Sequence, residues 1–190
     1  MSLSTPLRPL VRPLVRPLGA RLHLMALAAL AAAALMLTPP AQAGYEVNVG
    51  QGLTMAGVAG GKPAPLALRG YDPVAYFTDG KPRLGTSAHG HVHRGAAYWF
   101  VSEANKKTFA ADPAKYAPQY GGFCAYGVAN GMKFDGDPHL WKVAGGKLYL
   151  NVAPEIQSKW LQEVPGNVAK ADTNWGDIRT RSPQDLWDNK

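Results

Sequence analysis

The sequence predicts a small single domain of the α+β class, built from β-hairpins and short helices. Two stretches, residues 86–102 and 139–152, each place apolar and polar side chains around a short turn that contains glycine, which is typical of β-hairpins. Each stretch is followed by a segment in which apolar residues recur at helical spacing. A set of hairpins and short helices of this length favours one α+β domain.

The first 43 residues have the pattern of a secretory signal peptide. Their basic region contains four arginines and no acid: Arg8, Arg12, Arg16 and Arg21. An uninterrupted apolar run from Leu24 to Leu37 follows, and then the small-residue site Ala41-Gln42-Ala43. A retained membrane anchor is the alternative, but this run is shorter than the roughly 20 residues that a transmembrane helix needs. We therefore expect cleavage after Ala43, a periplasmic or secreted protein, and no membrane span after cleavage.

Removal of the signal peptide changes the charge of the remaining chain. Four of the 20 Lys and Arg residues leave with it, so 16 remain against 13 acids and the net charge falls from +7 to +3. A charge this small gives no indication of nucleic-acid binding. The chain from Gly44 to Lys190 is long enough for one hydrophobic core, and its single cysteine, Cys124, cannot form a disulfide within the chain.

Composition divides the chain into four parts. Residues 44–68 are rich in Gly and Pro and predict a flexible linker that ends in a short strand, whereas the polar C-terminal end is expected to fray in part. The predicted boundaries are 1–43 for the signal peptide, 44–68 for the linker, 69–175 for the domain and 176–190 for the tail. No internal repeat of useful length is evident in the domain.

The domain begins with a turn and a first hairpin. Asp72-Pro73 forces the turn, and the apolar residues after it predict core anchors. The hairpin turns at Arg94-Gly95. Ser102 suits the N-cap of a helix over 103–111, in which Phe109 should face the core. The predicted anchors are Val74, Tyr76 and Phe77.

The second half of the domain repeats these kinds of element. The glycine-bracketed stretch 121–131 predicts a short buried helix, and Gly145-Gly146 can take positive φ at both turn positions of the second hairpin. Pro154 suits the start of an amphipathic helix over 154–164. The residues expected on the apolar side of that helix are Ile156, Trp160 and Leu161 or Val164.

The stretch HGHVH, residues 89–93, is the main candidate for a functional site. Strand alternation would place His89, His91 and His93 on one face. Neighbours two apart are about 6.5–7 Å apart at Cα, so two imidazoles can bind one ion, whereas His89 and His93 are about 13 Å apart. Further ligands would have to come from elsewhere in the chain, and Cys124 and His139 would suit copper or zinc.

Each candidate also has a purely structural interpretation. The histidines could form the solvated face of an ordinary strand, with modest pH sensitivity. Free cysteines are more often buried, inert apolar side chains than reactive ones, so Cys124 could simply belong to the core. An enzyme that uses Cys124 as a nucleophile with a histidine as base is the least favoured alternative.

Four stretches between Arg69 and Trp175 resemble the YHS-domain family in its exported bacterial branch. They are RGYDPVAYFTDGKPRLG, GAAYWFVSEANKKTFAADPAKYAPQYGGFCAYGVANG, WKVAGGKLYLNV and PGNVAKADTNW. The resemblance implies a small α+β domain with a hairpin followed by a helix. It also implies an association with metal proteins, because related modules accompany copper-transporting ATPases and are similar to cysteine-bearing TRASH-like domains.

The sequence departs from the metal-associated members of that family at their thiol positions. Those relatives have Asp-Pro-Val-Cys where this chain has Ala75 in the last position, and further cysteines where this chain has Val101 and Asn105. What the chain retains is Cys124 and the strand histidines. The resemblance therefore lends metal binding to this chain as an analogy.

Two functional hypotheses remain open. The first is a transition-metal binding or handling module that holds copper or zinc through His89, His91, His93 and Cys124, and that serves a periplasmic or membrane partner protein. The second is a non-metal scaffold, or a ligand- or partner-binding domain, in which Cys124 is buried. Neither hypothesis predicts a catalytic residue or a cofactor other than the metal ion.

Overall fold

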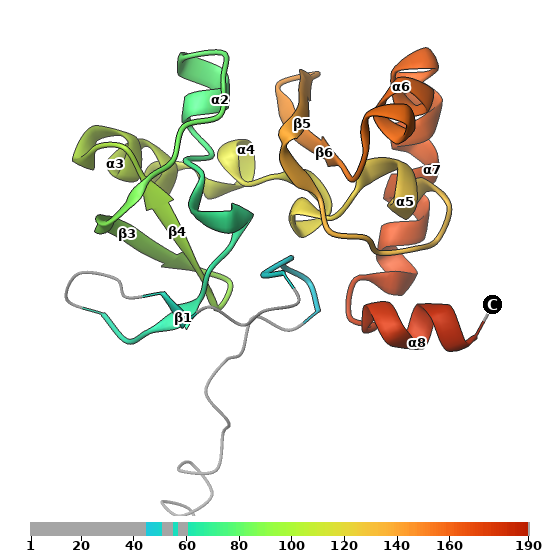
Figure 1. Cartoon of the computed structure of the whole chain (residues 1–190), viewed down its shortest axis with the longest axis horizontal. Coiled ribbons are helices and arrows are strands. Elements are labelled where there is room, and N and C mark those ends of the chain that lie inside the picture. Colours follow the sequence, from blue (N-terminus) through green and yellow to red (C-terminus); the bar gives the residue numbers. More distant parts are fainter. Residues whose placement is uncertain (1–44, 51–54, 57–60, 190) are drawn as a thin grey trace, which may run out of the picture. The chain divides into compact units, whose positions relative to one another are not determined.

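The computed structural model describes residues 45–50, 55–56 and 61–189, which Figure 1 shows as a coloured ribbon. The predicted signal peptide, residues 1–43, lies outside the described residues. Short antiparallel sheets and helices make up the described part of the chain, so the predicted α+β class is confirmed. Among these residues, no helix combines the length and the apolar character that crossing a membrane requires.

The described elements are centred on two β-hairpins, each built from a strand of eight residues and a strand of five and each followed by helices (Figure 1). In chain order the elements are β1 (Met55–Ala56), β2 (Ala64–Pro65), η1 (Leu68–Gly70), α2 (Ala75–Thr78), β3 (Thr86–His93), β4 (Ala96–Phe100), α3 (Glu103–Ala111), α4 (Pro113–Tyr116), η2 (Gln119–Gly122), α5 (Ala125–Ala129), β5 (Asp137–Ala144), β6 (Lys147–Asn151), α6 (Pro154–Gln162), α7 (Val164–Ile178) and α8 (Pro183–Asp188). The predicted hairpins and the helix over 103–111 are thus confirmed.

The hairpins β3–β4 and β5–β6 have the same register. Each begins with one residue pair, passes a bulge, and resumes with four consecutive pairs up to the turn. Adding 51 to every residue number of the first register gives the second. The matched pairs include Thr86–Phe100 with Asp137–Asn151, Gly90–Trp99 with Trp141–Leu150, and His93–Ala96 with Ala144–Lys147. Both turns, Arg94-Gly95 and Gly145-Gly146, have positive φ at both residues, as a tight hairpin turn of this kind requires.

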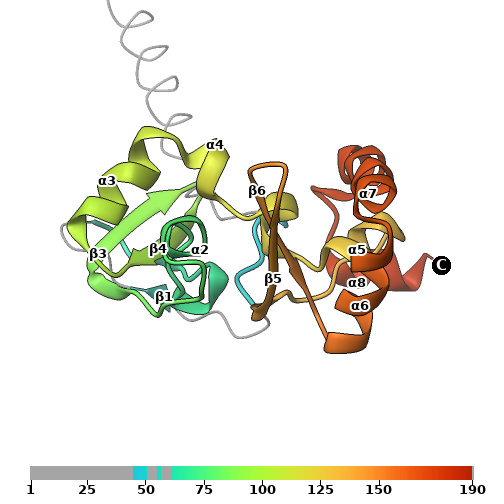
Figure 2. The same ribbon diagram turned by 90° about the horizontal axis from the view of Figure 1, so that it is seen from above.

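The helices that follow the hairpins match in the same way. α3 and α6 each span nine residues, and their bounds again differ by 51. Their N-caps, Ser102 (φ −154°, ψ 159°) and Ala153 (φ −149°, ψ 154°), have nearly equal backbone angles. Phe109 and Trp160, which are 51 residues apart, are both fully buried. Figure 2 shows each hairpin with the helices that follow it, in green for the first set and in orange for the second.

The segments that precede the hairpins also correspond. Their residue numbers differ by 52 at first and by 51 nearer the hairpin. Leu68–Gly70 and Tyr120–Gly122 are two runs of three residues with positive φ. After each run, a backbone N–H reaches across to the segment that leads into the hairpin: Asp72 N–H donates to the Arg83 carbonyl at 2.8 Å, and Cys124 N–H donates to the Phe134 carbonyl at 2.9 Å. The domain therefore contains two copies of one structural unit.

We call residues 68–116 the first repeat and residues 120–178 the second repeat. This duplication corrects the sequence-based expectation that the domain has no internal repeat. Positions shared by the repeats mostly keep backbone shape and buried volume, whereas their side-chain chemistry differs, as Asp72 and Cys124 illustrate. The signal that could have revealed the repeat is the constant offset of 51 in identical pairs, among them Gly95 and Gly146, Tyr98 and Tyr149, and Val101 and Val152.

The repeats meet through an apolar cluster of their own. Leu68 and Tyr76 of the first repeat pack with Leu148 and Leu150 on β6 of the second repeat. All four side chains are buried, and the Tyr76 hydroxyl donates a hydrogen bond of 3.0 Å to the carbonyl of Pro138. This junction between α2 and the β5–β6 hairpin positions the pocket described below.

The described part of the predicted linker is packed against the domain. Val47 and Ala67 are buried, and the short strand lies at Ala64–Pro65, slightly before the expected position. The Asn48 N–H donates to the Gly121 carbonyl at 2.9 Å. The expectation of a flexible linker over 44–68 is corrected for these residues, because apolar side chains at Val47 and Ala67 anchor them.

The C-terminal segment is also ordered into helices rather than frayed. α7 extends to Ile178, and α8 begins with a capping box between Ser182 and Asp185. Leu186 is buried. The buried ammonium of Lys133 donates to three backbone carbonyls and so joins this segment to the beginning of the described chain: Tyr45 at 2.7 Å, Arg179 at 2.7 Å and Arg181 at 2.8 Å.

Candidate functional site

The three histidines predicted as metal ligands share the face of β3 that looks toward α3. The ring centroids of His91 and His93 lie 5.9 Å and 5.8 Å from that of Phe109 on α3. The Nδ1 atom of His89 lies 3.6 Å from the Oε2 atom of Glu103, at the start of the same helix. The structure therefore brings His91 and His93 together on one aromatic ring and places His89 beside a carboxylate.

The surroundings of this face keep its two central imidazoles neutral. Partial burial lowers the pKa of His91, and the nearby Lys106 ammonium lowers it further. Burial also lowers the pKa of His93, with Arg94 and His91 adding to the effect. Since both pKa values lie below the ordinary 6.5, both imidazoles have free lone pairs at neutral pH.

Cys124 lies in the second repeat, at the N-cap of α5, and is fully buried. Its Sγ atom accepts a hydrogen bond from the Gly127 N–H at 3.4 Å and donates one to the Asn151 Oδ1 atom at 3.7 Å. Burial raises the pKa of the thiol, and hydrogen bonds from backbone N–H groups oppose that rise in part. These contacts describe a thiol held in the core of the second repeat, at a different place from the histidine face.

The structure does not assemble the full predicted ligand set. Within residues 45–50, 55–56 and 61–189, no three His, Cys, Asp or Glu side chains are grouped so that they could hold a metal ion. His139, considered as a further ligand, instead shares a 2.8 Å hydrogen bond between its Nε2 atom and the Tyr71 hydroxyl. Of the predicted residues, only His91 and His93 are paired in space.

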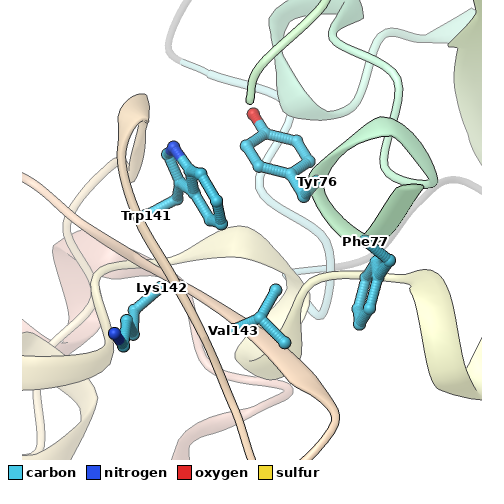
Figure 3. A pocket seen from close by; sticks show the side chains of 5 residues that line it. All are labelled: Tyr76, Phe77, Trp141, Lys142 and Val143. Atoms are coloured by element: carbon cyan, nitrogen blue, oxygen red, sulfur yellow. The ribbon is translucent and has the colours of Figure 1, made fainter. Parts of the chain in front are cut away.

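A pocket that sequence reasoning did not identify lies between α2 and β5. Its volume is about 590 Å³, and it is lined by Tyr76, Phe77, Trp141, Lys142 and Val143. In Figure 3, Trp141 faces Tyr76 and Val143 lies toward Phe77, whereas the Lys142 side chain extends away from both aromatic residues. The pocket is therefore lined mainly by aromatic and aliphatic side chains together with one lysine, and it is largely open to solvent.

Edge-to-face contacts hold the aromatic rings of the pocket in place. The ring centroids of Tyr76 and Trp141 are 5.2 Å apart, and those of Phe77 and Tyr116 are also 5.2 Å apart. Burial raises the pKa of the Tyr76 hydroxyl, so it stays protonated and continues to donate to the Pro138 carbonyl. Phe77, Trp141 and Val143 remain half-buried and present apolar surface to the cavity.

In the second repeat, the surface equivalent to this wall of the pocket is covered by the helix α7. Tyr76 and Phe77 correspond to Val128 and Ala129 on α5, at the shift of 52 found for this part of the repeat. Those two residues are buried, and the Nδ2 atom of Asn174 on α7 donates to their carbonyls at 3.0 Å and 3.1 Å. In the first repeat α4 ends after one turn, and its equivalent surface faces a pocket instead of a long helix.

No family model, curated protein or solved structure matches this chain.

Proposed function

We propose that this protein is an extracytoplasmic binding module that holds a small, uncharged, apolar ligand in the pocket between α2 and β5. The export that the first 43 residues predict provides the compartment. The single observation that supports the binding role most strongly is the aromatic lining: three half-buried apolar side chains and the Tyr76 ring line an open pocket of about 590 Å³. This proposal develops the alternative in which Cys124 is a buried core residue.

The chemistry of the lining supports an uncharged ligand. Lys142 is the charged residue of the lining, and its side chain extends away from Tyr76 and Phe77 (Figure 3). The Tyr76 hydroxyl already donates its proton to a carbonyl, so that proton is not free to bond a polar group of a ligand. Aromatic rings that present faces and edges to a cavity bind apolar and aromatic groups through burial and ring contacts.

A neutral fluorescent probe, N-phenyl-1-naphthylamine, tests this proposal. We expect it to bind the purified protein with increased emission, and we expect Trp141→Ala to weaken binding at least about tenfold, which corresponds to about 1.4 kcal/mol. Trp187→Ala is the matched control, since Trp187 is exposed on α8 and does not line the pocket. Trp187→Ala should leave the affinity unchanged.

A second variant separates loss of binding from loss of folding. Val143→Phe places a larger side chain in the cavity, so we expect it to abolish probe binding while the unfolding temperature stays at or above that of the original protein. Equal affinity in the original protein and in both pocket variants would refute the pocket as the site.

A weak two-histidine metal site on β3 is the second candidate function. The specific observation in its favour is that His91 and His93 share one face and are both neutral at neutral pH. Imidazole is a good ligand for copper(II) and zinc, and water would complete the coordination of an ion held by two side chains. The Lys106 and Arg94 cations near this face oppose the binding of a metal cation.

Titration with zinc or copper(II) tests the second candidate. We expect His91→Ala to remove binding and His139→Ala, which alters a histidine outside this face, to leave it intact. Because only neutral imidazole binds metal, and because the pKa values of His91 and His93 lie below 6.5, binding should persist at pH 6.5 and disappear as the pH falls through the lowered pKa values. Equal binding by both variants would exclude the histidine face.

A further inference from the structure

The duplication assigns a chemical environment to Cys124 that its sequence context does not reveal. Cys124 corresponds to Asp72 of the first repeat: both follow a run of positive φ, and both donate their backbone N–H to the matched carbonyl before the hairpin. Both residues are completely buried. A buried thiol therefore occupies the position of a buried carboxylate.

The Asp72 carboxylate is held by four hydrogen-bond donors. Its Oδ1 atom accepts from two backbone N–H groups at the start of α2, and its Oδ2 atom accepts from one backbone N–H and one side-chain amide. The donors are Val74 N at 2.8 Å, Ala75 N at 3.4 Å, Val101 N at 3.0 Å and Asn105 Nδ2 at 2.7 Å. Such a set satisfies the two oxygens of a buried anion.

Three of these four donors are present around Cys124. The Gly127 N–H donates to its sulfur at 3.4 Å, and the neighbouring backbone N–H groups of Val152 and Tyr126 act with it to lower the pKa of the thiol against the effect of burial. At the shifts of 52 and 51 these residues correspond to Val74, Ala75 and Val101. The donor set that holds a carboxylate in the first repeat thus surrounds a thiol in the second.

The fourth donor comes from a different residue. Asn105 has no amide counterpart in the second repeat, where Ile156 takes its place, but the side chain of Asn151 reaches the sulfur from β6. Asn151 is fully buried, and among the described residues its Nδ2 atom has no hydrogen-bond acceptor. An amide accepts from a thiol through its oxygen and, turned over, donates to an anion through its nitrogen. The oxygen of Asn151 faces the sulfur in the structure, and turning the amide over brings its unsatisfied donor to an anionic acceptor at the Cys124 position.

We propose that Cys124 is a site of oxidation by peroxide, and that its sulfinate occupies the second repeat as the Asp72 carboxylate occupies the first. A sulfinate places two oxygens and one negative charge on the atom attached to Cβ, as an aspartate does. The donors of Tyr126, Gly127, Val152 and Asn151 then bind these oxygens.

The oxidation takes two steps, each with one hydrogen peroxide. In the first, the thiol loses its proton to water that enters with the peroxide, the thiolate sulfur attacks one peroxide oxygen, the O–O bond breaks, and the sulfenic acid and hydroxide form; the hydroxide takes up the released proton as water. In the second, the sulfenic acid sulfur takes a second oxygen from another peroxide, which is reduced to water, and the sulfinic acid loses its proton. Because the chain has one cysteine, no internal thiol can divert the sulfenic acid into a disulfide.

Because Cys124 is fully buried, its oxidation is slow and its product changes the stability of the protein. Peroxide must reach the sulfur through local opening at α5 or β6, so the reaction is slow in the folded protein. Once formed, the sulfinate satisfies the buried Asn151 donor and links the N-terminus of α5 to the end of β6. We therefore expect the oxidised protein to unfold at a higher temperature than the reduced one.

Substitutions distinguish this proposal from an inert core cysteine. Cys124→Asp reproduces the carboxylate of the first repeat, and Cys124→Val retains an apolar side chain of similar size. We expect the Asp variant to unfold at a higher temperature than the Val variant at pH 7. An inert apolar role for the cysteine gives the opposite order, because an uncompensated buried carboxylate is strongly destabilising.

Mass spectrometry tests the modification itself. After treatment of the folded protein with hydrogen peroxide, peptide mapping should find about 32 Da added to the Cys124 peptide, the mass of two oxygens, and no addition at that residue in Cys124→Val. Mapping separates this product from methionine oxidation. The proposal is overturned if Cys124→Asp is less stable than Cys124→Val, or if Cys124 is oxidised only in urea-unfolded protein.

Discussion

Replacement of Asp72 by alanine is expected to lower the free energy of unfolding by about 3–5 kcal/mol. The change leaves four donors without their acceptor in a fully buried position, and each such donor costs about 1–3 kcal/mol before local relaxation. The donors belong to α2, to the end of β4 and to α3, so the carboxylate connects three elements of the first repeat. Urea denaturation followed by far-ultraviolet circular dichroism measures the loss.

Two further variants make this prediction specific. Asp177→Ala removes an exposed carboxylate from α7 and should change the free energy of unfolding by no more than about 0.5 kcal/mol. Asp72→Cys imports the residue of the second repeat, and its weak acceptor should recover part of the stability lost in Asp72→Ala. If Asp72→Ala costs as little as Asp177→Ala, the described hydrogen-bond set does not stabilise the first repeat.

Replacement of Trp160 by alanine should also cost about 3–5 kcal/mol, because it leaves a large cavity in the core of the second repeat. Trp160 is fully buried and lies 5.3 Å from the Tyr149 ring, centroid to centroid. Leu161→Ala is the matched control: the adjacent side chain is 44% exposed, so its loss should change stability by no more than about 0.5 kcal/mol. Differential scanning calorimetry of the variants measures both effects.

The phenylalanine variant of Trp160 tests the duplication directly. Phe109 fills the equivalent position of the first repeat, so the unit accepts a phenyl ring there. The indole Nε1 atom of Trp160 is buried and has no acceptor among the described residues, and its removal offsets part of the lost packing. We expect Trp160→Phe to cost clearly less than Trp160→Ala. Equal costs for the two variants would contradict the equivalence of these positions.

The hairpins and short helices could be predicted from the sequence because local residues determine them. Gly145-Gly146 can adopt positive φ without strain, and Ser102 caps α3 by accepting from the Asn105 N–H at 3.2 Å. Of the alternatives Leu161 and Val164 for the inward face of the helix over 154–164, Val164 is the one that packs against the core. Trp160 is buried, whereas Leu161 is exposed.

The C-terminal helix α8 was missed although its signal is local. Ser182 and Asp185 form a capping box, a pattern that can be read from the sequence. The ring of Trp187 packs edge-on against Phe134, with centroids 5.6 Å apart. Trp187 therefore belongs to the part of this segment that packs, which extends further toward the C-terminus than expected.

The pocket could not be predicted because its walls come from different repeats. Tyr76 and Trp141 each fit the pattern of an ordinary core residue, and only the packing of α2 against β5 leaves a cavity between them. The histidine face shows the opposite situation. Alternation along one strand correctly placed His91 and His93 together, and the pattern around Cys124 indicated burial, whereas no local pattern could tell that the thiol lies apart from the histidines in the other repeat.

Nuclear magnetic resonance of the five indole N–H groups tests the central claim most directly, namely that the pocket between α2 and β5 binds an apolar ligand. Each resonance can be assigned by single Trp→Phe substitutions in ¹⁵N-labelled protein. On addition of N-phenyl-1-naphthylamine, the account predicts a saturable shift of the Trp141 resonance, while those of Trp160 and Trp187 stay in place. A Trp141 resonance that does not move, or equal shifts of all three, would contradict it.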